Sequence, residues 1–276
     1  MRRHNLLRFL KTKATWLKEE TLKIHRIAPE TRLASSLSAI EIFTVLYYGG
    51  ILRFDPRNIN YPSRDRLIVS KGHGAISLYP VLADLGFFGK EELESVCKEG
   101  SRFGSIPDSL TPGIETVNGS LGHGLGVGCG IALALKRKKI YANVFVLAGD
   151  GELNEGSNWE AIMFAGHHKL NNLFLIIDNN KICMLDYCKN VIDLHPLEKK
   201  LNDFKWKTQV VDGHNISQLF SALSGIKKDK THYPKALIVN TKKGKGVRRL
   251  ENDPLCHIKS LKEEEVDKIL QNLRKK

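Results

Sequence analysis

The chain has 276 residues, enough for one large α/β domain or for one domain with extensions. Apolar residues make up 42% and charged residues 26%, as in ordinary globular proteins, and no apolar run is long enough to cross a membrane. The net charge is +13, but the lysines are spread along the chain without a recognisable nucleic-acid-binding module. We therefore expect a lysine-rich surface that helps attract anionic ligands, with no nucleic-acid or membrane partner.

The cysteines are odd in number and form no C-x-x-C pair, which argues against a disulfide framework and against a zinc site. We expect a reducing compartment, and hence a cytoplasmic protein. The five are Cys97, Cys129, Cys183, Cys188 and Cys256.

The first predicted element is an amphipathic helix within residues 1–26. Its start is basic, but charges interrupt it throughout, so it lacks the continuous apolar centre of a signal peptide. A mitochondrial-type address is an alternative that Glu19 and Glu20 weaken. Residues 36–50 are apolar all round and predict a buried helix. The apolar positions of the first helix include Leu6, Leu10, Trp16 and Leu17.

Short β-rich runs alternate with helical patterns along the rest of the chain. The predicted strands lie within residues 65–72, 143–151, 172–180, 206–211 and 235–241. The predicted helices are residues 73–88, 153–169, 215–226 and a charged helix at 261–276, and residues 119–139 begin in a glycine turn and become a helix with a basic end. Strands separated by helices predict the α/β class, with a parallel sheet and helices on both faces. We expect one domain over residues 1–276, with the first and last helices as extensions.

Two predicted strands end at oxygen-bearing side chains. Asp150 lies between Gly149 and Gly151 after one strand, and Asn180 follows the next. Glycines permit close backbone approach to a diphosphate, and ligands bind outside the carboxyl ends of parallel strands. Asp150, Asn180 and a nearby carbonyl such as that of Ile182 offer hard oxygen ligands to Mg²⁺, with Ca²⁺ as an alternative. Asp150 could instead only cap the helix that follows it.

This arrangement resembles the thiamine diphosphate-binding motif. The wider chain resembles the N-terminal, diphosphate-binding half of transketolase, in the form found as a separate subunit. The resemblance runs from about residue 10 to about residue 265, and it implies the thiamine diphosphate-binding fold. The segments that carry it are SLSAIEIFTVLYYGGILRFDP, SRDRLIVSKGHGAISLYPVLADLGFF, TPGIETVNGSLGHGLGVGCGIALALK, TKKGKGV and PLCHIKS.

The resemblance implies thiamine diphosphate and a metal as cofactors. Asp150, Asn180 and the carbonyl of Ile182 would hold the metal. Gly149 and Gly151 would allow the diphosphate to approach the backbone, with an N–H donated by Gly151.

The resemblance also implies that His73 and His257 lie beside the diphosphate and the reaction centre. Gly119 and Leu121 would offer backbone groups to the aminopyrimidine, and Lys243 would lie near the cofactor. Plainer alternatives remain: His73 could merely start a helix, His257 could be a surface-loop histidine, and the role of Lys243 is open.

Glu155 and Glu160 match the family's glutamates that link cofactor sites across a dimer, but they could simply be solvated. We expect the other histidines of this region to be structural and Cys129 to serve helix packing. Those histidines are His123, His167 and His168.

Two positions depart from the family on the substrate side. Arg32 falls where the family has a histidine that assists proton transfer, and arginine cannot act as a general base. Ile106 stands where the family has a second substrate-facing histidine. One hypothesis is that Arg32 clamps the carboxylate of a 2-oxo acid donor such as pyruvate. The alternative is a loop residue that points to solvent, or a slip of the alignment.

The implied function is that of the N-terminal subunit of a split transketolase-like enzyme. It would transfer a two-carbon unit, ketol or acetyl, from an α-keto donor to an aldehyde or ketone acceptor. In this family a glutamate of the pyrimidine-binding domain activates the cofactor. We therefore expect a partner subunit resembling the C-terminal part of transketolase, in an α₂β₂ assembly. The alternatives are the α subunit of a 2-oxo acid dehydrogenase and a non-catalytic cofactor-binding homologue.

Overall fold

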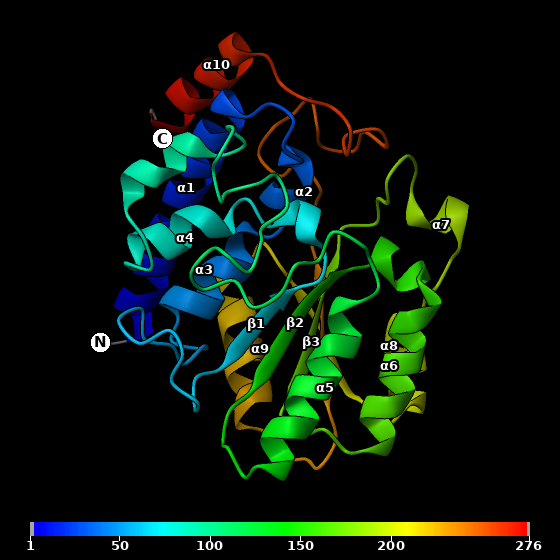
Figure 1. Ribbon diagram of the computed structural model, residues 1–276. Coiled ribbons are helices and arrows are strands. Elements are labelled where there is room, and N and C mark those ends of the chain that lie inside the picture. Colours follow the sequence, from blue (N-terminus) through cyan, green and yellow to red (C-terminus); the bar gives the residue numbers. More distant parts are fainter. Residues whose placement is uncertain (1–2, 275–276) are drawn as a thin grey trace.

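The computed structural model describes residues 3–274 and shows a parallel sheet with helices on both faces (Figure 1). The strands pair in the order β1-β2-β3-β5-β4, and all four pairings are parallel. This confirms the fold class that the sequence predicts. The strands are β1 (Arg66–Val69), β2 (Val144–Gly149), β3 (Leu173–Asn179), β4 (Lys207–Asp212) and β5 (Lys235–Asn240).

Helices cover the two faces of the sheet in two separate apolar clusters. One face carries α5 (Gly124–Arg137), α6 (Gly156–His167) and α8 (Leu197–Asp203). The other carries α1 (Arg3–Ile27), α2 (Leu33–Leu37), α3 (Ile40–Tyr48), α4 (Leu78–Asp84), α9 (Ile216–Lys228) and α10 (Glu263–Arg274). The short helix α7 (Cys188–Val191) lies in the connection that leaves β3.

The alternation of side chains along a strand explains the two clusters. In β2, Phe145 and Leu147 belong to the cluster with α1–α4, whereas Val144 and Val146 belong to the cluster with α5 and α6. Every residue of β2 and β3 is buried, as expected for central strands of a sheet covered on both faces.

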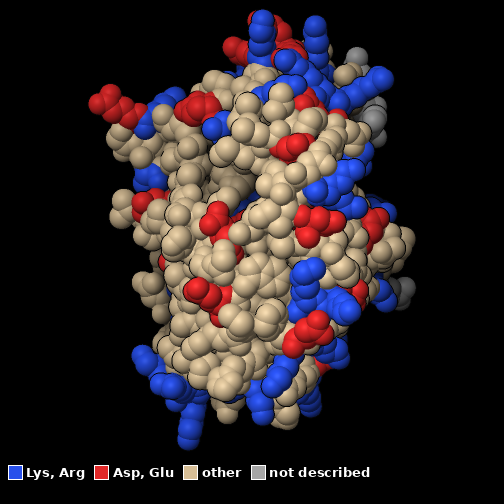
Figure 2. Space-filling view, turned by 90° about the vertical axis from the view of Figure 1, so that its right-hand side faces the viewer, with Lys and Arg blue, Asp and Glu red and all other residues tan. Residues whose placement is uncertain are grey.

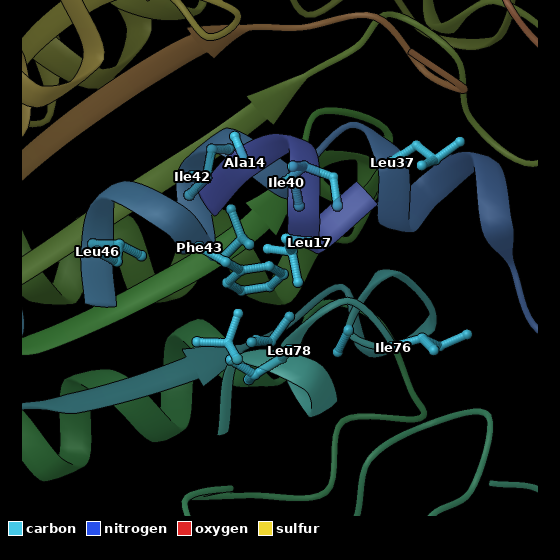
Figure 3. Close-up of a cluster of buried hydrophobic side chains, with 14 of the residues drawn as sticks. Ala14, Leu17, Leu37, Ile40, Ile42, Phe43, Leu46, Ile76 and Leu78 are labelled. Carbon is cyan, nitrogen blue, oxygen red and sulfur yellow. The ribbon is translucent and has the colours of Figure 1, made fainter. Parts of the chain in front are cut away.

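The helical layer on the α1 side has its own closely packed interior. Figure 3 shows Phe43 of α3 between Leu17 of α1 and Leu78 of α4. Figure 2 shows the side of the molecule that carries α6 and α8. Lysine and arginine side chains gather at its upper and lower ends and down the right-hand half of the view, and they are sparse at its centre. No helix within residues 3–274 is long and apolar enough to cross a bilayer.

Three predicted helices differ from the structure at their boundaries. The predicted helix at 36–50 is broken, because α2 ends at Leu37 and α3 begins at Ile40. Ser38 lies at the break, and its hydroxyl donates to a backbone carbonyl and to the buried carboxylate of Asp178, so it competes with regular helical bonding.

The predicted helix at 73–88 forms only from Leu78, after a tight turn over Gly72–Gly74. A similar short turn over Gly151–Asn154 delays α6 to Gly156. The terminal helices α1 and α10 are present as predicted, and residues 1–2 and 275–276 of those predictions lie outside the described residues.

Candidate active site

Asp150 and Asn180 lie together at the carboxyl ends of β2 and β3. Gly149 pairs with Asp178 in the parallel register, so the chain leaves both strands at the same level. The N–H of Lys181 donates to Asp150 Oδ2 over 2.7 Å. The Asn180 side-chain oxygen accepts from the N–H of Ile182 over 3.2 Å. The three residues predicted to hold a metal therefore share one corner, which we call the metal corner: Asp150 and residues 180–182.

Asp150 is a buried carboxylate that lacks a cationic partner. Its relative exposure is 5%, and it forms no ion pair with any lysine, arginine or histidine of residues 3–274. Burial, and then the negative charge of Asp178, raise the pKa of Asp150. Its side chain caps no helix, so the alternative of a simple helix cap is wrong. Carboxylate, amide and carbonyl oxygens in one buried corner fit a hard divalent cation.

Lys243 reaches the metal corner from the segment after β5. Its ammonium donates to the carbonyl oxygens of Ile182 and Cys183, each over 2.9 Å. Burial lowers the pKa of Lys243 to about 8. The Ile182 carbonyl, an expected metal ligand, therefore already faces a cation. This places Lys243 within the site and not merely near it.

His73 and His257 form a pair beside this corner, with ring centroids 4.8 Å apart. Nδ1 of His257 lies 3.1 Å from the Lys243 ammonium, which can only donate, so this nitrogen accepts. Burial, followed by the charge of Lys243, lowers the pKa of His257 to about 3. Burial, followed by the charge of Lys71, holds the pKa of His73 well below its usual value. Both rings are thus neutral near pH 7, and His257, at 9% exposure, is not a surface-loop histidine.

Arg32 lies just before α2. We call the part of the candidate site that holds Arg32 and Ile106 the substrate side, after the role that the sequence predicts for these residues. It is half-buried, and its guanidinium forms no hydrogen bond or ion pair with residues 3–274. Its charge is one of the causes that lower the pKa values of His73 and His257, so it lies within electrostatic reach of that pair. An unpaired guanidinium beside two neutral imidazoles leaves this side open to an anion.

Ile106 forms an apolar wall next to the glycine-rich loop. A side chain at Gly72 would place its Cβ 2.3 Å from the carbonyl oxygen of Asn118 and 3.1 Å from Ile106, so only glycine allows these segments to meet. Ile106 also comes within 3.9 Å of a Cβ built at Gly119. Gly119 and Leu121, predicted for the aminopyrimidine, are therefore in the loop beside His73.

Glu152 is a site residue that the sequence interpretation missed. It is 3% exposed, and its carboxylate accepts from the N–H groups of Gly122, over 3.0 Å, and Gly149, over 3.1 Å. The hydroxyl of Ser70 also donates to it. Glu152 thus joins the glycine-rich loop at Gly122 to the end of β2. The available signal was a carboxylate directly after Gly151.

Asp178 is a second missed residue and connects four segments. It is fully buried and accepts hydrogen bonds from Lys71, Ser38, Thr241 and, over 3.3 Å, the side-chain amide of Asn180. Burial by itself would raise the pKa of Asp178, but the charge and hydrogen bond of Lys71 outweigh it and the pKa is lowered. Asp178 therefore orients Asn180 and ties β3 to β1, α2 and β5.

The remaining predicted residues lie farther out. Glu155 and Glu160 are exposed at the start and on the surface of α6, so their interface role stays a prediction. Cys129 is buried between α5 and α6, as expected for packing. His123 lies within 3.0 Å of the Leu121 carbonyl oxygen, and His167 and His168 are exposed at the end of α6.

Comparisons with known proteins extend these observations. A family described as "Transketolase, thiamine diphosphate binding domain" matches residues 30–275. The chain is 38% identical over 241 residues to one of the subunits of apulose-4-phosphate transketolase from Actinobacillus succinogenes, covering 87% of this chain and 86% of that one. It is also 38% identical over 233 residues to the 6-deoxy-6-sulfo-D-fructose transketolase subunit SqwG of a Clostridium species, covering 84% of each.

Full-length transketolases are matched over part of their length. The chain is 36% identical to mouse transketolase, covering 97% of this chain and 42% of that protein. The crystal structure of transketolase from Campylobacter jejuni superposes with a TM-score of 0.89 at 28% identity, covering 97% of this chain and 43% of that one. With a family match over residues 30–275 and relatives of similar length, the chain belongs to the transketolase thiamine diphosphate-binding domain family.

Proposed function

We propose that this chain is the cofactor-binding subunit of a two-subunit transketolase-like transferase. It would take part in moving a two-carbon unit from an α-keto donor to an aldehyde or ketone acceptor. The observation that carries the proposal is the metal corner, where Asp150, Asn180 and the Ile182 carbonyl converge beside the neutral pair His73 and His257.

The cofactors we propose are thiamine diphosphate and Mg²⁺, with Ca²⁺ as an alternative metal. The donor set supports this, because hard oxygen ligands suit these ions and the buried Asp150 forms no ion pair within residues 3–274. Gly149, Gly151, Lys243 and the two histidines would surround the diphosphate. When bound, thiamine diphosphate supplies an electron sink for the bond next to the donor carbonyl.

A partner subunit would complete the site with a pyrimidine-binding domain and its activating glutamate, in an α₂β₂ assembly. The relatives of similar length are named as subunits, which supports a two-chain enzyme. Val127 of α5 and Met163 and Phe164 of the neighbouring helix α6 are exposed, as are Glu155 and Glu160. Large apolar side chains exposed on neighbouring helices are typical of an association surface.

The substrate side supports a donor with an anionic group. The unpaired guanidinium of Arg32 can bind a carboxylate through two parallel hydrogen bonds, and Ile106 offers an apolar wall in place of a polar contact. A 2-oxo acid such as pyruvate, which yields an acetyl unit, fits both features. The relatives are named for sugars that carry a phosphate or a sulfonate, so a ketol donor with such a group is the other member of this class. The five free cysteines fit a reducing, cytoplasmic setting.

The loss of two histidines gives weight to a second candidate, a non-catalytic homologue that binds the cofactor. The family match is to transketolase, and it therefore gives no support to the alternative of a 2-oxo acid dehydrogenase subunit. One experiment separates the candidates. The chain is co-expressed with a transketolase C-terminal-type subunit of the same genome, and the purified complex is assayed for cofactor binding and then for turnover.

We expect Mg²⁺-dependent binding of thiamine diphosphate by calorimetry, and turnover with pyruvate or with a ketose phosphate. Binding without turnover on any donor would identify the non-catalytic homologue. Absence of metal-dependent binding in the complex would overturn the proposal as a whole.

A further inference from the structure

A cavity of about 760 Å³ adjoins the metal corner on its β5 side. It shares Asn180, Ile182 and Lys243 with the candidate active site, but neither His73 nor His257 lines it. Its volume is in the range typical of small-molecule sites. Its other lining residues include Lys181, Lys189, Asp193, Lys242 and Lys245.

The cavity lies where the chain leaves the sheet in opposite directions. The segment after β3 runs through α7 to α8 on one face, whereas the segment after β5 bonds to α2 on the other, through Gly244 N–H and the Ala34 carbonyl. β3 and β5 are neighbours in the sheet although β4 comes between them in sequence. Crevices at such switch points, outside the carboxyl ends of parallel strands, are the usual ligand sites of open α/β sheets.

The charge of this cavity is strongly positive. Five lysines line it against one carboxylate, that of Asp193. Lys242 forms an ion pair with Glu251 over 3.3 Å. The carboxylate of Glu251 also interacts electrostatically with Lys245. Lys181, Lys189 and Lys245 form no side-chain hydrogen bond or ion pair with residues 3–274. Like charges that converge on one hollow repel one another, and an anion bound among them would relieve that repulsion.

Lys181 is held in place by its backbone. It has a φ of +66°, in the left-handed region that residues with a side chain adopt only at a cost in energy. Its N–H donates to Asp150 over 2.7 Å, and this bond helps to fix the turn. The same turn thus carries one lysine of the cavity and one hydrogen bond to the metal corner. A ligand of the cavity and a cation at Asp150 would share this segment.

We infer that this cavity binds a small molecule through a phosphate or sulfonate group held by Lys181, Lys189 and Lys245. Lysine ammonium groups bind such oxyanions as point charges, without the paired geometry that a guanidinium requires. The anion is either the charged end of the substrate or a separate effector. Binding itself does not depend on the proposed transferase activity, whereas the assignment to the substrate rests on it.

The test of binding uses inorganic phosphate as the probe and the full chain, at constant ionic strength, with affinity measured by calorimetry. The double variant Lys189→Gln/Lys245→Gln removes two lysines of the cavity. The matched control Lys138→Gln/Lys268→Gln removes the same charge from exposed positions elsewhere. We expect phosphate affinity to fall at least about tenfold in the first and to change less than about twofold in the control. No binding to the wild-type chain, or an equal loss in both variants, would overturn the inference.

A second arm identifies the source of the anion in the complex with its partner subunit. If the substrate supplies it, the cavity variant raises KM for a phosphorylated acceptor and leaves KM for the unphosphorylated analogue unchanged. If KM is unchanged for both while phosphate affinity falls, the ligand is a separate effector. A complex that binds phosphate but neither thiamine diphosphate nor substrate would contradict the proposed function and leave the phosphate site standing.

Discussion

The metal corner and the substrate side of this protein are built differently. Asp150 and Asn180 directly follow central strands. The N–H groups of Lys181 and Ile182 donate to them, and the Asn180 side-chain amide donates to Asp178. Arg32 and Ile106 stand on connecting segments, and neither side chain makes a hydrogen bond within residues 3–274. The difference is that hydrogen bonds tie the metal-corner side chains to the ends of the sheet, whereas no such bond ties the side chains of Arg32 and Ile106 to residues 3–274.

The substrate side is nevertheless not loose. His25 of α1 holds the segment that carries Arg32: its Nδ1 lies 2.9 Å from the hydroxyl of Thr31. Its Nε2 accepts from the N–H of Leu261, over 3.2 Å, in the segment that follows His257. One buried histidine therefore fixes both chain segments of the substrate side. A side chain such as that of Arg32 can therefore be replaced while the backbone segment that carries it keeps its position.

The largest expected effect comes from breaking the buried pair below the metal corner. Lys71→Met leaves the fully buried carboxylate of Asp178 without its cation, which should lower the free energy of unfolding by about 3–5 kcal/mol. Urea unfolding followed by circular dichroism measures this loss. Lys90→Met is the matched control, because its ion pair with Asp84 is exposed and should be worth less than about 1 kcal/mol. An equal, small effect of both variants would show that the buried pair of Lys71 and Asp178 does not hold the metal corner in place.

The second prediction concerns how the free energy of unfolding depends on pH through His25, the histidine that holds the two segments of the substrate side. Burial lowers the pKa of His25 to about 4, against an ordinary value of 6.5. The unfolded chain therefore binds a proton between these values that the folded chain excludes, so stability falls as pH decreases from 6.5 towards 4. The free energy of unfolding lost through His25 alone approaches about 3 kcal/mol near pH 4. Urea midpoints at pH 7.5, 6 and 5 should show the decline, and His25→Gln should remove much of this slope.

A third prediction separates function from stability at the metal corner. Asp150→Asn should weaken Mg²⁺-dependent binding of thiamine diphosphate by more than about 100-fold, since even supporting residues around a metal cost 10–100-fold. Without metal, the same variant should unfold at higher urea than the wild type. The reason is that burial and the charge of Asp178 make the Asp150 carboxylate unfavourable, as its raised pKa indicates. Asp203→Asn, on the exposed end of α8, is the control and should change neither quantity.

The sequence predicted the sheet, both strand ends and the metal corner because these depend on local patterns. A strand that ends just before Asp150, a helix, and a second strand that ends just before Asn180 are sufficient to bring the two side chains together. Lys71 and Asp178 could not be predicted as a pair, because 107 positions separate them and charged residues are assigned to the surface by default. The break between α2 and α3 was missed for a similar reason, since Ser38 finds Asp178 at a distance of 140 positions.

The smallest expected effect tests the variable tip of the substrate side. Arg32→Ala should raise KM for a 2-oxo acid donor about tenfold in the complex, which corresponds to one charge-assisted hydrogen bond. The KM of Arg32→Lys should lie between that of the wild type and that of Arg32→Ala, because lysine keeps the charge but lacks the planar guanidinium. Affinity for thiamine diphosphate should change less than about twofold in both variants, since Arg32 bonds to no residue of the metal corner. Arg137→Ala, at the exposed end of α5, is the control. An unchanged KM for every active donor would show that Arg32 binds no substrate carboxylate, and the anion-binding role would then fall to the lysines of the neighbouring cavity.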